Sequence, residues 1–195
     1  MIETWIQKYI ASQIVNLENF PEKEVTKLIE TLRTANIEGR QIFVLGNGGS
    51  AANASHFITD LGKGVTGEGI RKFKCRAMNE SIAWMTAIGN DFSYEELFCK
   101  QLENFAVAGD LVLIMSVSGT SPNIIKAAKW SKENGLYVVA LVGNKDTPLY
   151  SIADQVIPVH DNHYGRVEDL HVLICHVVAY AFMEHPDLVR LPVSV

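Results

Sequence analysis

Hydrophobic residues recur at helical spacing at the start of the chain. Over residues 2–18 this spacing predicts an amphipathic helix. Pro21, a residue favoured in the first turn of a helix, begins a second predicted helix that stops near Gly39. The first helix has two interpretations, ordinary packing on its own domain or a contact with another subunit.

Shorter apolar runs further along the chain predict buried strands, which alternate with helices. The predicted strands are residues 42–45, 111–115, 137–142 and 156–159, with a weaker one at 74–77. The predicted helices between and after them are residues 51–61, 80–89, 94–106, 121–133 and 166–183. This alternation predicts an α/β fold, a doubly wound and mainly parallel five-stranded sheet flanked by helices, with two helices before it.

The length of 195 residues suits one domain. It divides into an N-terminal helical segment (1–39), an α/β core (40–183) and a short tail (184–195). Four glycines within residues 62–69 predict a mobile loop.

Composition narrows the class of protein. Hydrophobic residues make up 48% and charged residues 20%, as in a globular protein, and a net charge of −5 without a basic run argues against binding nucleic acid. No apolar stretch reaches the roughly 20 residues that span a bilayer, and the N-terminus lacks a signal-peptide pattern. The three scattered cysteines form no CxxC motif, which predicts free thiols in a reducing compartment. We therefore expect a cytoplasmic protein.

A glycine turn after the first predicted strand is the strongest candidate binding site. Residues 46–50 read GNGGS and lead into an alanine-rich helix. Such a turn offers backbone N–H groups and a helix N-terminus to an anion, usually a phosphate. The dinucleotide and Walker patterns are both absent, so the predicted ligand is a phosphate on something smaller than a nucleotide.

A second turn of the same kind follows the strand at 111–115. Residues 116–121 read SVSGTS, and Ser121 and Pro122 suit the N-cap and first position of the next helix. Capping alone can explain Ser121, but hydroxyl residues packed around a glycine favour a phosphate site. Two such turns at the carboxyl ends of strands in one sheet predict a ligand crevice.

Titratable residues on two predicted helices are candidates for acid–base or metal chemistry. His56 and Asp60 are four residues apart and share one helix face, while the last helix offers Glu168, His171 and His176. We expect His171 to be an ordinary core residue. His176 stands in an apolar run and needs a partner, such as a carboxylate from another segment. These side chains are also suitable ligands for zinc or another divalent metal.

Together these motifs resemble the sugar isomerase (SIS) domain family, whose members bind phosphosugars. The resemblance runs over nearly the whole chain. Within the family, GNGGSAANASHF (46–57), AIGNDF (87–92) and RVEDLHVLICH (166–176) are most similar to phosphoheptose isomerase, and a bacterial replication-initiator-associating protein shares much of the pattern.

The resemblance implies roles for individual residues. Asp60 and His176 are the implied catalytic pair, moving protons between a ketose phosphate and an aldose phosphate through an enediol. The implied zinc ligands are His56, Asp60, Glu168 and His176. The implied substrate-binding residues are Asn47, Gly48, Gly49, Ser50, Asp91, Ser116, Ser118, Ser121 and Glu168, of which the serines hold the phosphate while Asn47 and Asp91 contact sugar hydroxyls.

Two positions depart from the family pattern. The family has glutamate at the place of Asp60, so the base here is one methylene shorter, and glutamine at the place of Glu168, so a negative charge is added. Glu168 and His176 are also eight residues apart, a rise of about 12 Å along a helix, so joint metal binding needs both side chains to lean inward. A neighbouring subunit supplying part of the site is the alternative.

The resemblance therefore predicts an isomerase that converts sedoheptulose 7-phosphate to glycero-manno-heptose 7-phosphate. Two alternatives keep the phosphate turns: an isomerase of another sugar phosphate, and a phosphosugar-binding adaptor without catalysis. The family forms homotetramers with sites near subunit interfaces, so we also expect a homo-oligomer. Residue spacing alone does not identify the sugar or the metal.

Overall fold

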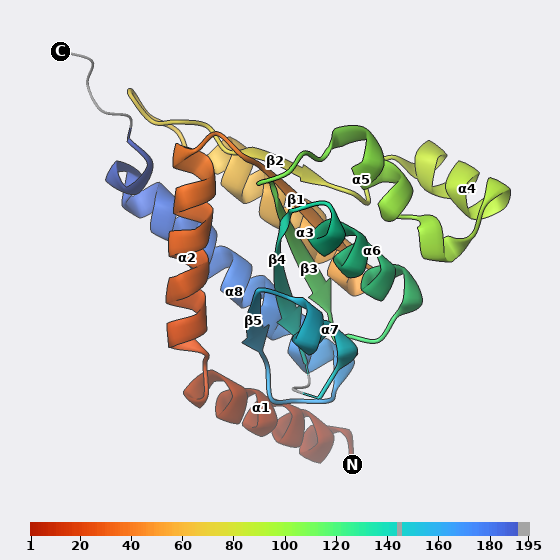
Figure 1. Ribbon diagram of the computed structural model, residues 1–195. Helices are drawn as coiled ribbons and strands as arrows, with labels where there is room; N and C mark the ends of the chain where they lie inside the picture. The colour runs from red at the N-terminus through yellow and green to blue at the C-terminus, as the bar shows by residue number, and fades with distance from the viewer. Residues whose placement is uncertain (144–145, 191–195) are drawn as a thin grey trace.

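A computed structural model of the chain describes residues 1–143 and 146–190. Five parallel strands form one sheet in the order β2-β1-β3-β4-β5 (Figure 1). The strands are β1 (Gln41–Gly46), β2 (Lys74–Ala77), β3 (Leu111–Ser116), β4 (Tyr137–Val142) and β5 (Gln155–Pro158). The predicted parallel α/β sheet is confirmed, including its weaker strand at 74–77.

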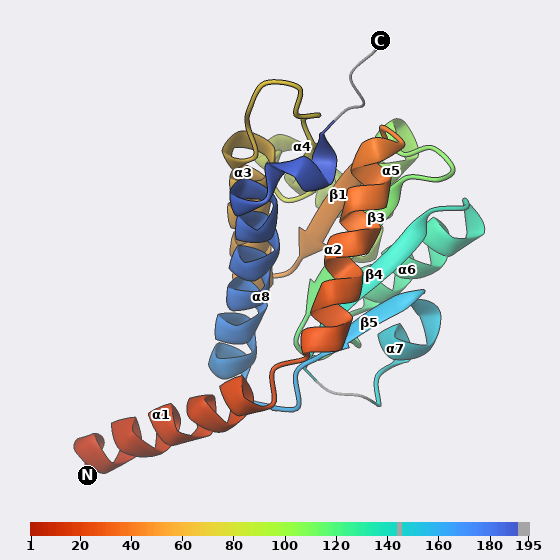
Figure 2. The ribbon, with the colours of Figure 1, turned by 90° about the vertical axis from the view of Figure 1, so that its left-hand side faces the viewer.

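Helices cover both faces of this sheet (Figure 2). One face carries α2 (Glu22–Ile37), α3 (Gly49–Thr59) and α8 (Tyr164–Glu184), and the other carries α5 (Cys99–Phe105), α6 (Pro122–Glu133) and α7 (Pro148–Ile152). Successive side chains of a strand point to opposite faces, so Ile42 and Val44 of β1 enter the first core layer while Phe43 and Leu45 enter the second. Burial on both faces explains why β1, β3 and β4 read as nearly continuous apolar runs.

The order of the strands fixes where the two predicted turns meet. The chain passes from β1 to β2 on one side and then crosses to β3 on the other, so β1 and β3 are neighbours at the point where the winding reverses. In open α/β sheets this switch point is where ligands bind, outside the carboxyl ends of the strands. Both the turn after β1 and the turn after β3 lie there.

Several predicted boundaries differ from the structure. The predicted helix at 94–106 is divided into a short 3-10 turn, η2 (Tyr94–Glu96), and α5. The short helix α7 was not predicted, because its five residues are too few to show periodicity. Thr147 is its N-cap, and the Thr147 side chain accepts a hydrogen bond from the Tyr150 N–H. The strand predicted at 156–159 is shifted by one residue at each end.

Three further helical segments lie between or after these elements. Helix α3 continues into a π-helical turn, η1 (Asp60–Gly64), so the glycine-rich segment predicted as a loop begins in helical geometry. Helix α4 (Ile82–Asp91) projects from the body beside η2 (Figure 1). In the predicted tail, a 3-10 turn, η3 (Pro186–Val189), follows α8, and residues 191–195 lie outside the described residues.

Helix α1 (Ile2–Glu18) extends away from the body (Figure 2). It is attached through polar contacts, among them Tyr9 Oη to Asp169 Oδ2 at 3.0 Å and Asn16 Nδ2 to Asp161 Oδ2 at 2.8 Å. Its apolar residues remain exposed: Ile2, Trp5, Ile6, Ile10, Ile14, Val15 and Leu17. Packing of this apolar face on its own domain, one of the two interpretations of the helix, is therefore not what the structure shows.

None of the helices within the described ranges is long and apolar enough to cross a membrane.

Candidate functional site

The first glycine turn brings backbone and hydroxyl groups to the carboxyl end of β1. Gly46 lies so close to the next strand that a Cβ there would be 2.8 Å from the Met115 carbonyl oxygen. Gly48 has a φ of 55°, a left-handed conformation that glycine adopts without strain. Helix α3 then begins at Gly49, and Ser50 is buried in its first turn.

The second turn is held by its own serines. Ser116 Oγ accepts from the Gly119 N–H at 3.1 Å, and Ser118 Oγ accepts from the Thr120 N–H at 3.3 Å. Ser121 precedes Pro122 at the start of α6, although its side chain makes no capping hydrogen bond. These hydroxyls and the helix N-terminus face the first turn across the switch point.

The two turns enclose a small cavity of about 60 Å³, which we call the cradle. This volume is several times the ~10–15 Å³ that admits one water molecule, so it suits a compact group of several atoms. Its lining residues are Asn47, Ser50, Met115, Ser116, Val117, Ser118, Ser121, Tyr164 and Glu168. The structure thus brings together the four serines predicted to hold a phosphate, with two further predicted substrate-binding residues beside them.

Glu168 reaches the cradle from α8. A Cβ on Gly49 would lie 2.4–2.5 Å from its carboxylate atoms, so the absence of a side chain at Gly49 makes room for this carboxylate. The Glu168 backbone carbonyl accepts from Asn53 Nδ2 at 3.0 Å, which joins α3 to α8 at this level. The carboxylate therefore lies over the first turn of α3.

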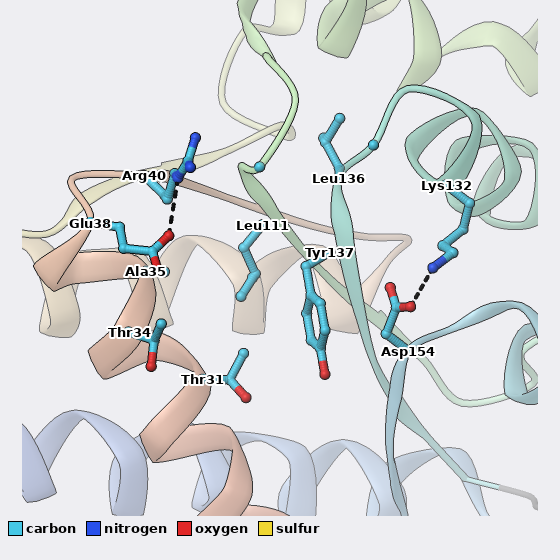
Figure 3. A pocket seen from close by; sticks show the side chains of 12 residues that line it. Thr31, Thr34, Ala35, Glu38, Arg40, Leu111, Lys132, Leu136, Tyr137 and Asp154 are labelled. Carbon is cyan, nitrogen blue, oxygen red and sulfur yellow. Dashed lines mark hydrogen bonds and ion pairs between the residues drawn. The ribbon is translucent and has the colours of Figure 1, made fainter.

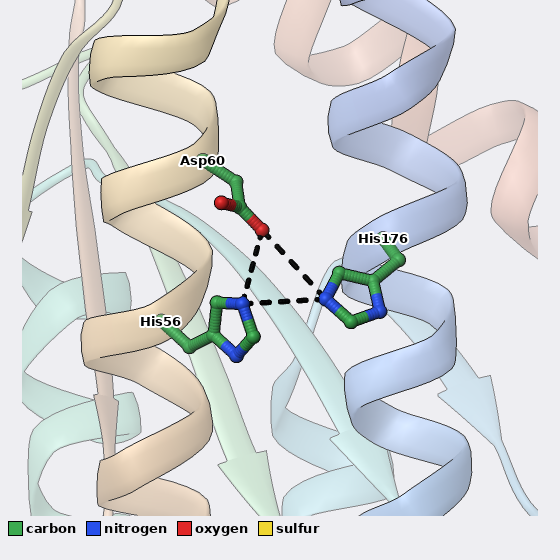
Figure 4. Close-up of side chains that lie close together, drawn as sticks. All are labelled: His56, Asp60 and His176. Atoms are coloured by element: carbon green, nitrogen blue, oxygen red, sulfur yellow. Dashed lines mark hydrogen bonds and ion pairs between the residues drawn. The ribbon is translucent and has the colours of Figure 1, made fainter.

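A second cluster of functional groups lies further along α3. His56 Nε2 is 3.2 Å from Asp60 Oδ2 and 3.3 Å from His176 Nε2, and His176 Nε2 is 3.7 Å from the same Asp60 oxygen (Figure 4). The three side chains come from α3, the start of η1 and α8, and all are at least partly exposed. The packing of α8 against α3 and η1 thus places the Asp60 carboxylate beside His176, the kind of partner that was expected for a histidine in an apolar run.

These three groups have the chemistry and the spacing of a metal site. Neutral imidazole nitrogens and a carboxylate oxygen are common zinc ligands, and catalytic zinc sites use three protein ligands with a fourth position open. Ligands bound tetrahedrally at ~2.0–2.1 Å from zinc lie roughly 3.4 Å from one another. The separations of 3.2, 3.3 and 3.7 Å are close to this value, so the donor set fits a divalent metal.

Two predicted site residues do not lie where their predicted roles would place them, Glu168 as a metal ligand and Asp91 as a substrate-binding residue. Within the described residues, Glu168 is not part of the group of potential metal ligands. Asp91 ends α4, is exposed, and accepts a hydrogen bond from Asn90 Nδ2 at 2.8 Å. It is not among the residues lining the cradle of this single chain.

Sequence reasoning missed Tyr164, which lines the cradle, and two residues that contact Asn47. Asn123, in the first turn of α6, exchanges two hydrogen bonds with Asn47, and Tyr94 Oη of η2 lies 3.2 Å from Asn47 Oδ1. The only feature of the sequence that could have indicated Asn123 is its place two residues after the serine turn, next to Pro122. No signal marks Tyr94.

Other titratable groups near α8 are buried. His171 is fully buried, as expected of a core residue, and burial lowers its pKa to about 4. Cys175 is also buried, which strongly raises the pKa of its thiol, with a further contribution from the negative charge of Asp60. Neither group belongs to the cradle or to the cluster.

A larger cavity of about 520 Å³ lies at the opposite edge of the sheet, where β3 and β4 begin (Figure 3). Two ion pairs border it, Arg40 with Glu38 and Lys132 with Asp154, and Tyr137 lies between them. None of the predicted site residues lines this cavity. The candidate site is therefore the smaller cradle and not the larger opening.

The fold and the cradle define an α/β protein with a small, serine-lined crevice at the switch point of a parallel sheet. A family model for the SIS domain matches residues 7–143. The phosphoheptose isomerase of Aneurinibacillus thermoaerophilus is 34% identical over 186 residues, covering 89% of this chain and 90% of that protein. That of Geobacter sp. (strain M21) is 34% identical over 164 residues, covering 80% and 79%.

The structure agrees with these sequence matches. The solved structure of phosphoheptose isomerase from Neisseria gonorrhoeae matches with a TM-score of 0.86 and 25% identity, covering 94% of this chain and all of that one (100%). The chain therefore belongs to the SIS domain family and, within it, to the phosphoheptose isomerases.

Proposed function

We propose that the protein is an aldose–ketose isomerase that converts sedoheptulose 7-phosphate to glycero-manno-heptose 7-phosphate. The observation that carries this proposal is that one helix, α3, has the cradle at its start and His56 near its end, where Asp60 of η1 and His176 of α8 lie beside it. From Ser50 to His56 the helix rises about 9 Å, which suits a long sugar chain held by its phosphate at one end. The relatives named phosphoheptose isomerase support the same substrate.

The cluster supplies the two proton carriers that the reaction needs. Asp60 would remove the proton from C1 of the ketose, next to the C2 carbonyl, while His176 gives a proton to the carbonyl oxygen to form the enediol. Return of a proton to C2 and loss of the proton on the C1 hydroxyl then give the aldehyde. Asp60 Oδ2 faces the two imidazoles, and its other oxygen points away from them (Figure 4). One carboxylate can therefore contact the histidines and still offer an oxygen to the substrate.

We further propose that His56, Asp60 and His176 hold zinc or another divalent metal. Glu168, the fourth ligand that the resemblance implies, lies at Gly49 and is left out of this proposal. The support is the fit of the three donor atoms described above. A metal held by these residues would supply positive charge to stabilise an oxyanion that develops during the reaction.

We also propose that the protein acts as a homo-oligomer, as a tetramer in the cytoplasm. The exposed apolar face of α1 supports an oligomer, because a contiguous apolar surface of this kind marks an interaction site. The three free cysteines support a reducing compartment. Light scattering tests the assembly: a monomer would contradict the proposal, and Ile6→Glu should dissociate an oligomer held by α1.

The activity is tested by incubating the purified protein, after its metal content is measured, with sedoheptulose 7-phosphate and following the aldose by NMR. Conversion should be lost in His176→Ala and Asp60→Asn and retained in His185→Gln, a change at an exposed histidine after the end of α8. Conversion of another ketose phosphate instead would identify a different sugar isomerase. Binding without conversion of any ketose phosphate would identify a phosphosugar-binding adaptor.

The metal proposal has its own test. Purified protein should contain about one divalent ion per chain by mass spectrometry, and His56→Ala should lose it. Protein that is active with no bound metal would overturn the assignment.

A further inference from the structure

A reciprocal amide pair joins the two turns of the cradle. Asn47 Nδ2 donates to Asn123 Oδ1, and Asn123 Nδ2 donates to Asn47 Oδ1, both at 2.9 Å. Asn123 is only 1% exposed, whereas Asn47 lines the cradle. The pair thus consists of a buried member held by the protein and a member that lines the cradle.

The backbone determines which way both amides point. The Ile124 N–H donates to Asn123 Oδ1 at 3.0 Å, and a backbone N–H can only donate, so the Asn123 atom that it meets must be the oxygen. The NH₂ group of Asn123 then faces Asn47 and needs an acceptor, which requires Asn47 to present its oxygen there. Tyr94 Oη, at 3.2 Å, can donate to the same oxygen.

We propose that Asn123 is a positioning residue, which fixes Asn47 so that it offers the substrate one N–H donor and no acceptor. Asn47 Oδ1 is already engaged by Asn123 and Tyr94. One hydrogen of Asn47 Nδ2 is used by Asn123, and the other has no hydrogen-bond partner within residues 1–143 and 146–190. This proposal rests on the proposed function, and it requires the sugar phosphate to place an accepting oxygen next to Asn47.

The reverse orientation of Asn47 is disfavoured by the same contacts. Turning its amide over would set NH₂ against NH₂ and oxygen against oxygen, which removes both hydrogen bonds of the pair. Each hydrogen bond corresponds to about three- to tenfold in an equilibrium constant, so the pair favours the observed orientation by about ten- to a hundredfold. Loss of Asn123 therefore leaves Asn47 in place but without a fixed orientation.

A double-mutant cycle with sedoheptulose 7-phosphate tests this role. Asn123→Ala should lower kcat/KM about three- to tenfold, and the same change in the Asn47→Ala background should cost nothing further, because Asn123 acts through Asn47. Asn36→Ala is the matched control: Asn36 is also buried at 2% exposure, but it bonds the Arg71 carbonyl at 3.1 Å and should leave kcat/KM unchanged. An equal loss from Asn123→Ala in both backgrounds would overturn the proposal.

A measurement without substrate separates this proposal from the proposed function. In side-chain amide NMR spectra, one Nδ2 proton of Asn47 should exchange slowly with water, and Asn123→Ala should remove that protection. An Asn47 amide that is unchanged in Asn123→Ala would overturn the positioning role whatever the activity. A parent protein that shows the protected proton but no conversion would overturn the proposed function alone.

Discussion

The buried imidazole of His171 should make the stability of the protein depend on pH. Its ring has no exposed surface, and an interaction with the Val142 backbone offsets the effect of burial only in part. Burial penalises the charged form, so its pKa falls to about 4, against an ordinary histidine value of about 6.5.

The direction of the effect follows from which state binds the proton. Between about pH 6.5 and pH 4 the unfolded chain protonates His171 while the folded chain does not, so the unfolded state is favoured as the pH falls. Above pH 7 this proton uptake has no effect on the free energy of unfolding. It lowers that free energy by roughly 2 kcal/mol at pH 5 and by roughly 3 kcal/mol near pH 4.

Urea denaturation at pH 7.5 and pH 5.0 measures this contribution. Between these two values the parent protein should lose about 2 kcal/mol more of its unfolding free energy than His171→Leu, which cannot take up the proton. His185→Gln, at an exposed histidine, should behave like the parent. An unchanged pH dependence in His171→Leu would refute the reasoning, because it would show that the folded state accommodates the charge.

Three further predictions concern the site itself. Asp60→Asn should lower kcat by about 10²–10⁴ with little change in substrate affinity by calorimetry, since the amide cannot accept the proton; weakened binding with normal turnover would contradict this. Gly46→Ala should lower the free energy of unfolding in urea by about 1–3 kcal/mol, because the new Cβ would meet backbone atoms. Gly49→Ala should lower it less, because the flexible end of Glu168 can move; equal losses in the two variants would argue against this difference. Tyr94→Phe should raise KM no more than about threefold, because it loses one exposed hydrogen bond to Asn47. A more than threefold change in kcat would instead indicate that Tyr94 takes part directly in the reaction.

Part of the fold and site followed from the sequence alone because the relevant information is local. Apolar runs, helical spacing and glycine turns each involve residues within a few positions of one another, so the five strands and both turns were predicted with small errors at their ends. The cradle between the two turns could be predicted from the sequence for the same reason. Parallel strands bring their carboxyl ends to one edge, which places the two serine-bearing turns together.

Only the tertiary structure decided how side chains from separate helices meet. The packing of α3 against α8 sets His56 Nε2 3.3 Å from His176 Nε2, although 120 residues separate them in the chain. The same packing directs Glu168 to Gly49 and away from this cluster, because a helix rises about 12 Å over the eight residues between Glu168 and His176. Asn123 and Tyr94 join Asn47 for a similar reason: their contacts depend on the placement of α6 and η2 over the sheet, which no local pattern records.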